Sequence, residues 1–372
     1  MFVITFAILW SFSYFYLFIH IILIFSTILY VLPVVKESVN NHKYKTINLF
    51  EYVTGFDLYW LFLTPLMMLL LINFSWTSPT LSTWFGHLIF HSFQFKIFYL
   101  VNFFFFLIIT TYSMSFYFSS REVYDYVIIC FSFFFWVLLL FYANTIFTVI
   151  FFIEILSTLV FLLLITSTFS TTYFYNNINL NLHNYFSNTV PTFYIQMLMY
   201  FFWISLISSL NLFFFLILFY LKFLSFDWFL FEFIFNYLIS ISDLKDLFYV
   251  VFIWTNLLFC IFLKCGLAPF YFWKPTFFKG VPLHALNFYI LFYYFFILLF
   301  FIHYFLVYSN EIFYFFIFIN IFLLMAGVLL LMFILCEAYY LKTFLALSSI
   351  LNTLFVFLAL SGVHITDCAL FL

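Results

Sequence analysis

One apolar run in this chain ends on a lysine that lies beside two helix-breaking residues. The run starts at about Leu247 and reaches Lys264 without passing another charge. A lysine at the centre of a membrane helix costs about 2.5–3.5 kcal/mol on insertion scales. Because Gly266 loosens the chain and Pro269 removes a backbone donor, we expect the helix to break beside the charge. Broken helices at membrane depth face protein or a water-filled cavity, so the pattern predicts a buried ion site at Lys264.

The composition indicates the surroundings of this run. The chain has 372 residues, of which 69% are hydrophobic and only 6% are charged. A soluble domain carries about 25% charged residues, so this chain cannot cover itself with a water-facing surface. We therefore predict an all-α polytopic membrane protein that is surrounded by lipid. The formal net charge of −2 indicates no nucleic-acid partner, and the first residues carry no basic leader, so we expect no cleaved targeting peptide.

A membrane helix needs about 20 predominantly apolar residues, and the apolar runs provide about ten such helices. They are predicted at 2–35, 58–74, 97–118, twice within 126–169 with a turn near Asn144, and at 193–222, 247–269, 285–308, 312–335 and 341–362. The charged stretch 119–125 is predicted to be a turn, and the polar stretch 170–192 a loop. We expect the aromatic stretch 223–241 to lie in the membrane interface, with a further crossing as the alternative.

Only two charges lie deep within the predicted helices, namely Glu154 and Lys264. Because neither has another intramembrane partner in the chain, we expect them to approach within hydrogen-bond distance or one water. At about 4 Å and an effective dielectric constant near 20, such a pair is worth roughly 4 kcal/mol. Separating the pair would therefore make Lys264 release a proton more readily. The alternative is a static ion pair that fixes two helices.

The residues from Lys264 to Pro282 also carry a family resemblance. The segment K-C-G-L-A-P-F that begins at Lys264, followed by Trp273, Pro275, Gly280 and Pro282, resembles the K-x-G-x-A-P-F-H-x-W-x-P…G-x-P signature of subunit 2 of mitochondrial NADH dehydrogenase. The match holds in register over about nineteen residues. This subunit is one of the antiporter-like proton-pumping subunits of respiratory complex I.

Some positions depart from the family pattern. Tyr271 stands where the family usually has histidine, and Lys274 and Thr276 also differ. A second segment, 342–352, is similar to the family's K-R-x-x-A-Y-S-S-I-A-H pattern, with Asn352 in place of the final histidine. The two motifs follow each other in the order that the family has.

The resemblance implies roles for individual residues. Lys264 would hold the transferred proton, and Glu154, in a segment similar to the family's E-L-x-S helix, would modulate it. The family places a second lysine where this chain has Tyr294. We expect Tyr294 to face the interior and to relay protons through ordered water. Further candidates for such a relay are Lys342, Ser348 and Ser349.

The resemblance also implies an antiporter-like fold in the mitochondrial inner membrane. Residues 1–125 would form an N-terminal three-helix segment, and 126–308 a complete five-helix repeat with a broken helix near 264–270. Residues 309–372 would form two helices of a second repeat. Because the family's second repeat is longer and has its own lysine, we expect a separate polypeptide to supply the missing C-terminal helices. Other membrane-arm subunits of complex I would be the remaining partners.

By resemblance, the chain would be a membrane-arm subunit of proton-translocating NADH:ubiquinone oxidoreductase. It contains no dinucleotide-binding glycine pattern and no iron–sulfur cysteine pattern, so we expect no cofactor and no redox centre in it. His87 and His91 have the i, i+4 spacing of a helical metal site, but no acidic residue accompanies them, and we expect no metal there. Two alternatives remain, a stand-alone cation/proton antiporter subunit and a non-pumping structural scaffold of the same complex.

Overall fold

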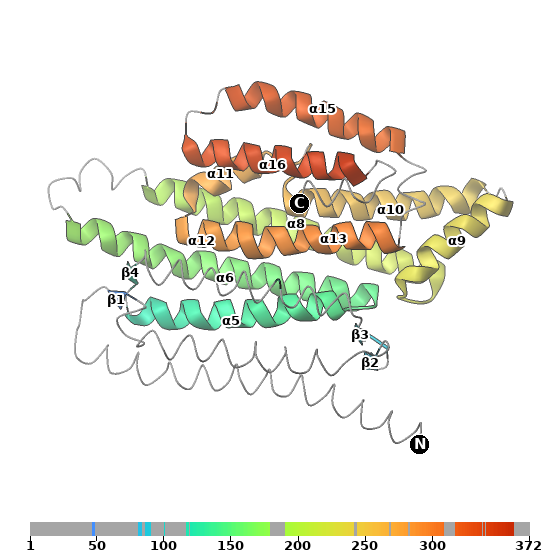
Figure 1. Cartoon of the computed structure of the whole chain (residues 1–372), viewed down its shortest axis with the longest axis horizontal. Helices are drawn as coiled ribbons and strands as arrows, with labels where there is room; N and C mark the ends of the chain where they lie inside the picture. Colours follow the sequence, from blue (N-terminus) through green and yellow to red (C-terminus); the bar gives the residue numbers. More distant parts are fainter. Residues whose placement is uncertain are drawn as a thin grey trace, which may run out of the picture. The chain divides into compact units, whose positions relative to one another are not determined.

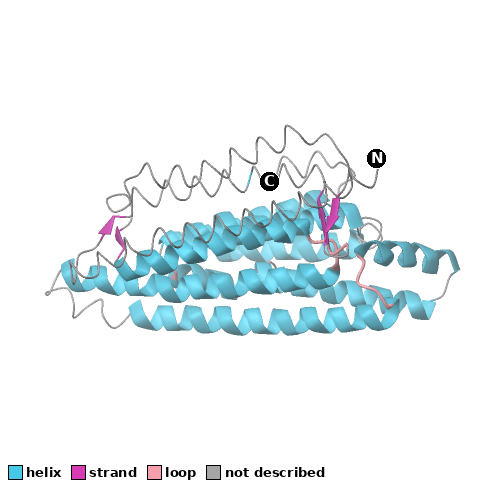
Figure 2. Cartoon of the chain, turned by 90° about the horizontal axis from the view of Figure 1, so that it is seen from below, coloured by secondary structure: helices cyan, strands magenta, loops and turns pink. Residues whose placement is uncertain are grey.

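The computed structural model describes most of the chain from residue 120 onward. The described residues are 120–178, 190–241, 244–267, 269–281, 283–308, 317–336, 338 and 340–360, with short pieces at 47–48, 81–83, 86–90, 100 and 117–118. The predicted helices at 2–35 and 58–74 lie outside this part, as does nearly all of 97–118. Helices dominate what is described (Figure 2), in agreement with the predicted all-α class.

Ten α-helices and one π-helix are described (Figure 1). They are α5 (Ser120–Tyr142), α6 (Ile146–Ile178), α8 (Val190–Phe223), α9 (Trp228–Ile241), α10 (Leu244–Cys265), α11 (Trp273–Gly280), α12 (Leu283–Phe288), η1 (Tyr289–Tyr294), α13 (Phe295–Tyr308), α15 (Ile317–Cys336) and α16 (Leu341–Leu360). Two antiparallel strand pairs join β1 (Ile47–Asn48) to β4 (Tyr117–Phe118) and β2 (Leu81–Thr83) to β3 (Leu88–Phe90).

The chain folds into two compact units. The first comprises Met1–Leu180 and Pro282–Tyr293, and the second comprises Asn181–Val281 and Tyr294–Leu372. The three segments expected from the repeat pattern stay a prediction.

In the first unit, α5 and α6 lie side by side and are joined by a three-residue turn at Ala143–Thr145 (Figure 1). Threonine is favoured at the position before a helix, and Thr145 precedes α6 there, with its Oγ1 3.1 Å from His87 Nδ1. The side-chain amide of Asn144 donates to the carbonyl of Gly86 at 3.1 Å. The chain therefore turns near Asn144, where the sequence predicts it.

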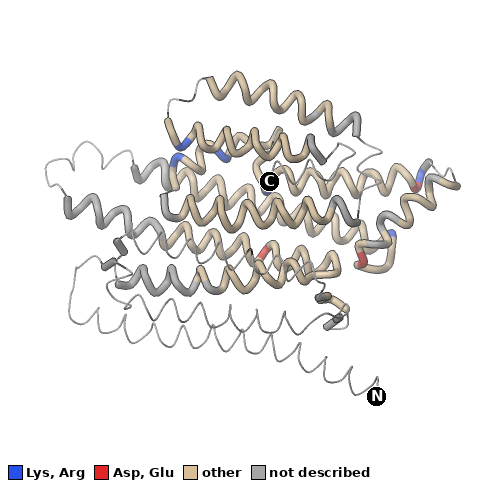
Figure 3. Tube along the Cα trace, viewed as in Figure 1, with Lys and Arg blue, Asp and Glu red and all other residues tan. Residues whose placement is uncertain are grey.

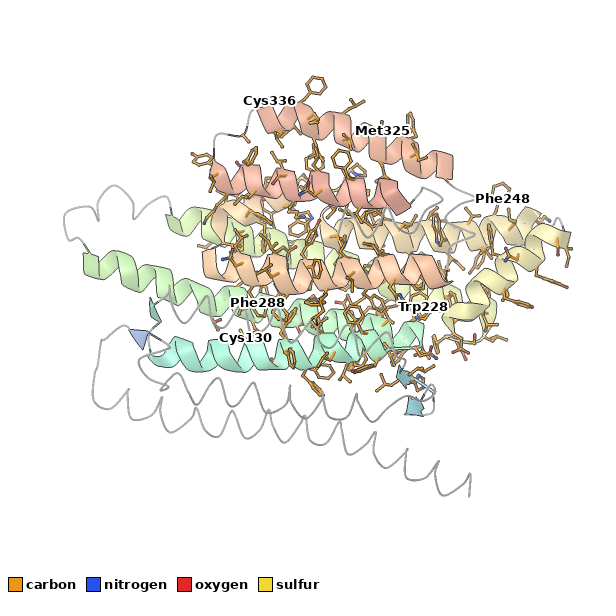
Figure 4. All side chains as sticks on the ribbon, in the orientation of Figure 1. Cys130, Trp228, Phe248, Phe288, Met325 and Cys336 are labelled. Atoms are coloured by element: carbon orange, nitrogen blue, oxygen red, sulfur yellow. The ribbon has the colours of Figure 1, made fainter. Side chains whose placement is uncertain are left out.

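Aromatic side chains fill the contact between α5 and the helix that starts at Leu283. Phe133 of α5 is fully buried. Its ring meets the edges of Phe288, at a centroid distance of 5.1 Å, and of Phe292, at 6.0 Å. Figure 4 marks this region with the labels of Phe288 and Cys130, which is also buried. Edge-to-face pairs of this kind are worth about 0.5–1.5 kcal/mol beyond the area they bury.

In the second unit, α8 packs against α10 and α11, and α16 packs against α11 and α15. Phe201 of α8 stacks on Phe277 of α11 at 5.4 Å and meets the ring of Trp273 at 6.3 Å. An ion pair between Lys222 and Asp246 connects the end of α8 to the start of α10. The short helix α11 is therefore held between α8 and α16.

Several boundaries differ from the prediction. α5 begins at Ser120, so residues 120–125 of the charged stretch predicted as a turn are helical. α6 continues to Ile178 and α8 begins at Val190, so residues 170–178 and 190–192 of the predicted loop are helical. The common reason is that polar and charged residues end an apolar run without ending a helix. The last two residues of the helix predicted at 97–118 form strand β4 instead.

The helix α11 is absent from the prediction, and η1 is a π-helical turn inside the helix predicted at 285–308. Each is short, with 8 and 6 residues, and too short to show a periodic pattern of its own. In the stretch 223–241, α9 has 14 residues, fewer than the about 20 that a crossing needs. Its place in the interface stays a prediction.

Within the described part of the chain, four helical segments are long and apolar enough to cross a membrane. They are Ile146–Thr166, Ile195–Phe223, Lys245–Cys265 and Ala285–Tyr304. Figure 3 shows how few charged residues interrupt the described helices. Large apolar side chains are exposed, such as Leu210 on α8 and Phe333 on α15, which is the surface that lipid contacts in a membrane protein. The chain is thus an all-α membrane protein, and the number of ten crossings stays a prediction.

Candidate functional site

The helix that carries Lys264 ends in a Schellman motif at Gly266. The Gly266 N–H donates to the carbonyl of Leu263 at 3.3 Å, and the Leu267 N–H donates to that of Phe262 at 2.8 Å. Gly266 has a φ of 62°, in the left-handed region that only glycine adopts without cost. The helix α10 therefore stops at Cys265 because Gly266 is the residue that follows.

The chain resumes as helix α11 at Trp273 after the exposed Pro269. The indole N–H of Trp273 donates to the carbonyl of Leu263 at 3.3 Å, so a carbonyl at the end of α10 receives a second donor. A Cβ atom on Gly266 would lie 3.1 Å from the Trp273 ring and 3.2 Å from Cδ of Lys274. Gly266 is thus required both for the turn and for the close approach of α11.

Lys264 lies in the last turn of α10, and only 5% of it is exposed. A positive charge at the C-terminal end of a helix gains about 0.3–1 kcal/mol from the helix dipole. Removing an ammonium group from water costs several kcal/mol, so the dipole offsets a small part of this cost. The sequence-predicted lysine is therefore buried beside a helix break.

A second buried lysine, Lys274, lies on the other side of the break. It is fully buried, and its ammonium group has no hydrogen-bond acceptor among the residues that the structure describes. The Nζ atom lies 3.6 Å from the centroid of the Tyr294 ring and 6.0 Å from that of Phe278. The helix α11 lies outside the four described segments that are long and apolar enough to cross a membrane. Burial lowers the pKa of Lys274 from 10.5 to about 7, and the electrostatic effect of Cys265 opposes this shift.

Tyr294 is the last residue of the π-helix η1 and is buried. Its hydroxyl donates to Oγ1 of Thr353 on α16 at 3.0 Å, and Thr353 in turn donates to the carbonyl of Ile350 at 2.8 Å. A π-helical turn shifts the register of a helix and is frequent at functional sites. The relay role predicted for Tyr294 remains a prediction.

The other three relay candidates lie on α16, and the structure gives them local partners. Lys342 donates to the carbonyl of Val281, the residue after α11, at 2.7 Å. The hydroxyls of Ser348 and Ser349 donate to the carbonyls three residues earlier, at 3.0 and 2.7 Å. Lys342 thus ties α16 to the end of α11, while the two serines bond within their own helix.

Glu154 lies on α6 and is half-buried. Ser157 donates its hydroxyl to the backbone carbonyl of Glu154 at 2.7 Å, and the same oxygen is 3.4 Å from Glu154 Oε2. Glu154 belongs to the first unit and Lys264 to the second. Their pairing stays a prediction.

His87 lies in the turn between β2 and β3, with its ring against Thr145. The i, i+4 spacing to His91 therefore does not place His87 on one face of a helix, as a helical metal site would need. The hydrogen bond between His87 and Thr145, at the turn between α5 and α6, gives the His87 ring a partner. His91 lies outside the described residues.

Sequence reasoning missed the roles of Lys274 and Thr353 and the hydrogen bond of Trp273. In the sequence, Lys274 stands out only as a departure from the family pattern, and that departure signals a second lysine near the break. No sequence pattern marks Thr353 as a partner of Tyr294, because a lone threonine in an apolar helix is common. The hydrogen bond of Trp273 depends on the path of the chain through the break, which no spacing rule gives.

These features define a class, an all-α membrane protein with a broken helix whose two halves each carry a buried lysine. No family model and no curated protein matches the chain. Its fold is similar to that of a chain of respiratory complex I from Thermus thermophilus, solved with bound aureothin, with a TM-score of 0.52 and 16% sequence identity. The likeness covers 81% of this chain and 57% of that one, so the chain spans a little over half the length of its structural relative.

Proposed function

We propose that this chain is a membrane-arm subunit of a proton-translocating NADH:ubiquinone oxidoreductase and resembles subunit 2 of the mitochondrial enzyme. Its membrane would then be the mitochondrial inner membrane, and its partners the other membrane-arm subunits. The redox step would take place elsewhere in the complex. The observation that carries the proposal is the buried Lys264 at the Schellman end of α10, in a chain whose fold resembles one of complex I.

Each residue has a proposed part in moving protons. Lys264 holds the transferred proton, and its amine is buried in the last turn of α10, beside the helix break. Glu154 modulates Lys264 by approaching or leaving it. The hydroxyl of Tyr294 passes protons along its hydrogen bond to Thr353, because a phenol can both donate and accept a hydrogen bond.

Hydrogen bonds support two further parts of the proposal. Lys342 acts by holding the end of α11 in place through its bond to Val281. Ser348 and Ser349 have acceptor capacity left, because each donates its proton to its own helix. They are able to order water only as acceptors.

Copurification tests this function. The tagged chain is extracted in mild detergent and assayed for NADH:ubiquinone oxidoreductase activity, which we expect to accompany it. Recovery of the intact chain without that activity would favour the stand-alone antiporter. In an assembled complex, Lys264→Met is expected to abolish most proton translocation, and unchanged translocation would favour the structural scaffold.

A further inference from the structure

Lys274 has a charge that packing alone does not explain. Its side chain is fully buried, and its Nζ has no hydrogen-bond acceptor among the described residues. The methylene stem contributes contacts, such as the one of Cδ above Gly266, and a methionine would supply similar ones. An ammonium group without acceptors is costly to bury. A purely structural residue at this position would therefore gain by losing its charge.

In the described part of the chain, the elements packed on α11 bring no carboxylate into an ion pair with Lys274. On α10, the titratable neighbours are Cys265 and Lys264, and the Cys265 sulfur is within electrostatic range of both lysines. The two lysines thus lie on either side of the turn at Gly266, one at the end of α10 and one at the start of α11.

The remaining neighbours are aromatic or already engaged. Tyr294 turns its ring face to the ammonium group, while its hydroxyl is bonded to Thr353. From α16, Lys342 is bonded to the carbonyl of Val281. From α8, Phe201 packs on the rings of α11, and Lys222 is paired with Asp246. No anion among these groups holds Lys274 in its charged form.

We propose that Lys274 is a second proton-carrying residue of this chain and exchanges its proton with Lys264 across the break at Gly266. In the step, the ammonium group of Lys274 gives one proton to the neutral amine of Lys264, directly or through one water. One N–H bond breaks and one forms, and the total charge of the pair is unchanged. The ring of Tyr294 stabilises the charged form of Lys274 through a cation–π contact, which strengthens when the cation is removed from water. The inference rests on the proposed function and adds a residue to it.

Two substitutions in the assembled complex separate a proton carrier from a structural residue. Lys274→Met removes the charge and keeps the stem, and Lys274→Arg keeps a charge that is never released. A proton carrier is needed in both forms, so we expect both variants to lower proton translocation by about a hundredfold. The matched control is Lys279→Met on the same helix, which changes charge equally at a half-buried site over the Tyr340 ring, and we expect it to translocate protons normally.

A direct titration makes the result independent of complex I activity. With the lysine side chains labelled with nitrogen-15, we expect one amine signal that is missing from Lys274→Met to titrate near 7 instead of 10.5. Wild-type translocation in Lys274→Met, or rescue by Lys274→Arg, would overturn the proposal, and so would a titration at the ordinary value. If the chain copurifies without NADH:ubiquinone activity, the proposed function fails, and the titration still decides whether Lys274 exchanges a proton.

Discussion

The ammonium group of Lys274 lies 3.6 Å from the centre of the Tyr294 ring, whose hydroxyl binds Thr353. Tyr294 thus has two different partners, the Lys274 ammonium group on its ring face and the Thr353 hydroxyl at its own hydroxyl. The ammonium group comes from α11 and the tyrosine from η1, so two separate elements bring the pair together.

The first prediction concerns the hydroxyl of Tyr294. Tyr294→Phe keeps the ring over which Lys274 lies and removes the hydrogen bond to Thr353. We expect the free energy of unfolding to fall by about 1 kcal/mol and proton translocation to fall as well, because the relay loses its donor. Thermal unfolding in detergent and proton translocation by the assembled complex measure the two effects.

Thr353→Val is the matched partner for this test. If the two hydroxyls act through one hydrogen bond, the double variant loses less than the sum of the two single losses, by a coupling energy of about 0.5–1.5 kcal/mol. Additive losses would mean that the two groups act separately. Unchanged translocation in Tyr294→Phe would show that the hydroxyl relays no proton and that Tyr294 acts only through the contact of its ring with Lys274.

The second prediction concerns the glycine at the break. Gly266→Ala places a Cβ at a φ of 62°, about 3.1 Å from the Trp273 ring and 3.2 Å from the Lys274 stem. We expect a loss of about 2–3 kcal/mol in stability, from backbone strain and from displacement of α11. Translocation is expected to fall with it, since Lys274 moves away from Tyr294.

Gly86→Ala is the control for the effect of backbone strain on stability. Gly86 also has a positive φ, of 89°, but a Cβ there would meet nothing within 4 Å. It should therefore lose stability through strain alone and keep its translocation. Equal effects of the two alanines on translocation would show that the crowding at Gly266 is irrelevant to function.

The third prediction concerns the bond from Lys342 to the carbonyl of Val281. Lys342→Met removes a charged hydrogen bond worth about 1.5–3 kcal/mol, so we expect a lower unfolding midpoint and a loosened end of α11. Lys342→Arg retains a donor and should restore most of the stability and the translocation. A loss of translocation in the arginine variant with normal stability would instead support proton exchange by Lys342 itself.

Much of the helical framework follows from the sequence because the apolar runs are long. α8, α10, α15 and α16 lie within a few residues of their predicted bounds. The Gly266–Pro269 pair indicated the end of α10, since a left-handed glycine and a following proline are local signals. The buried Lys264 follows from the same run.

The features of the site that could not be predicted from the sequence depend on contacts between segments that are distant in the chain. Thr353 becomes a partner of Tyr294 only because α16 packs near the end of η1, 59 residues further along the chain. Lys274 sits in a short stretch with prolines and polar residues, and such a pattern is typical of a loop. Its burial comes from the way α8 and α16 enclose α11, which no local pattern records.

The last prediction concerns the dependence of stability on pH. Burial lowers the pKa of Lys274 to about 7 in the folded chain, against an ordinary value of 10.5. Between these two values, the unfolded chain binds more protons at this residue than the folded chain does, so the free energy of unfolding rises with pH. Each pH unit in this window is worth about 1.4 kcal/mol, which makes the whole effect roughly 5 kcal/mol.

Lys274→Met has no group to titrate at this site and should lose this pH dependence. We expect the variant to be more stable than the wild type near pH 7, because a buried charge is replaced by an apolar side chain of similar size. As the pH rises towards 10, the wild type gains stability and the difference between the two proteins shrinks. Thermal unfolding midpoints in detergent across this range measure the trend, with Lys279→Met as the lysine control that should follow the wild type. A constant difference between wild type and Lys274→Met would mean that Lys274 keeps its proton when the chain folds, and it would contradict the assignment of Lys274 as a group that releases one.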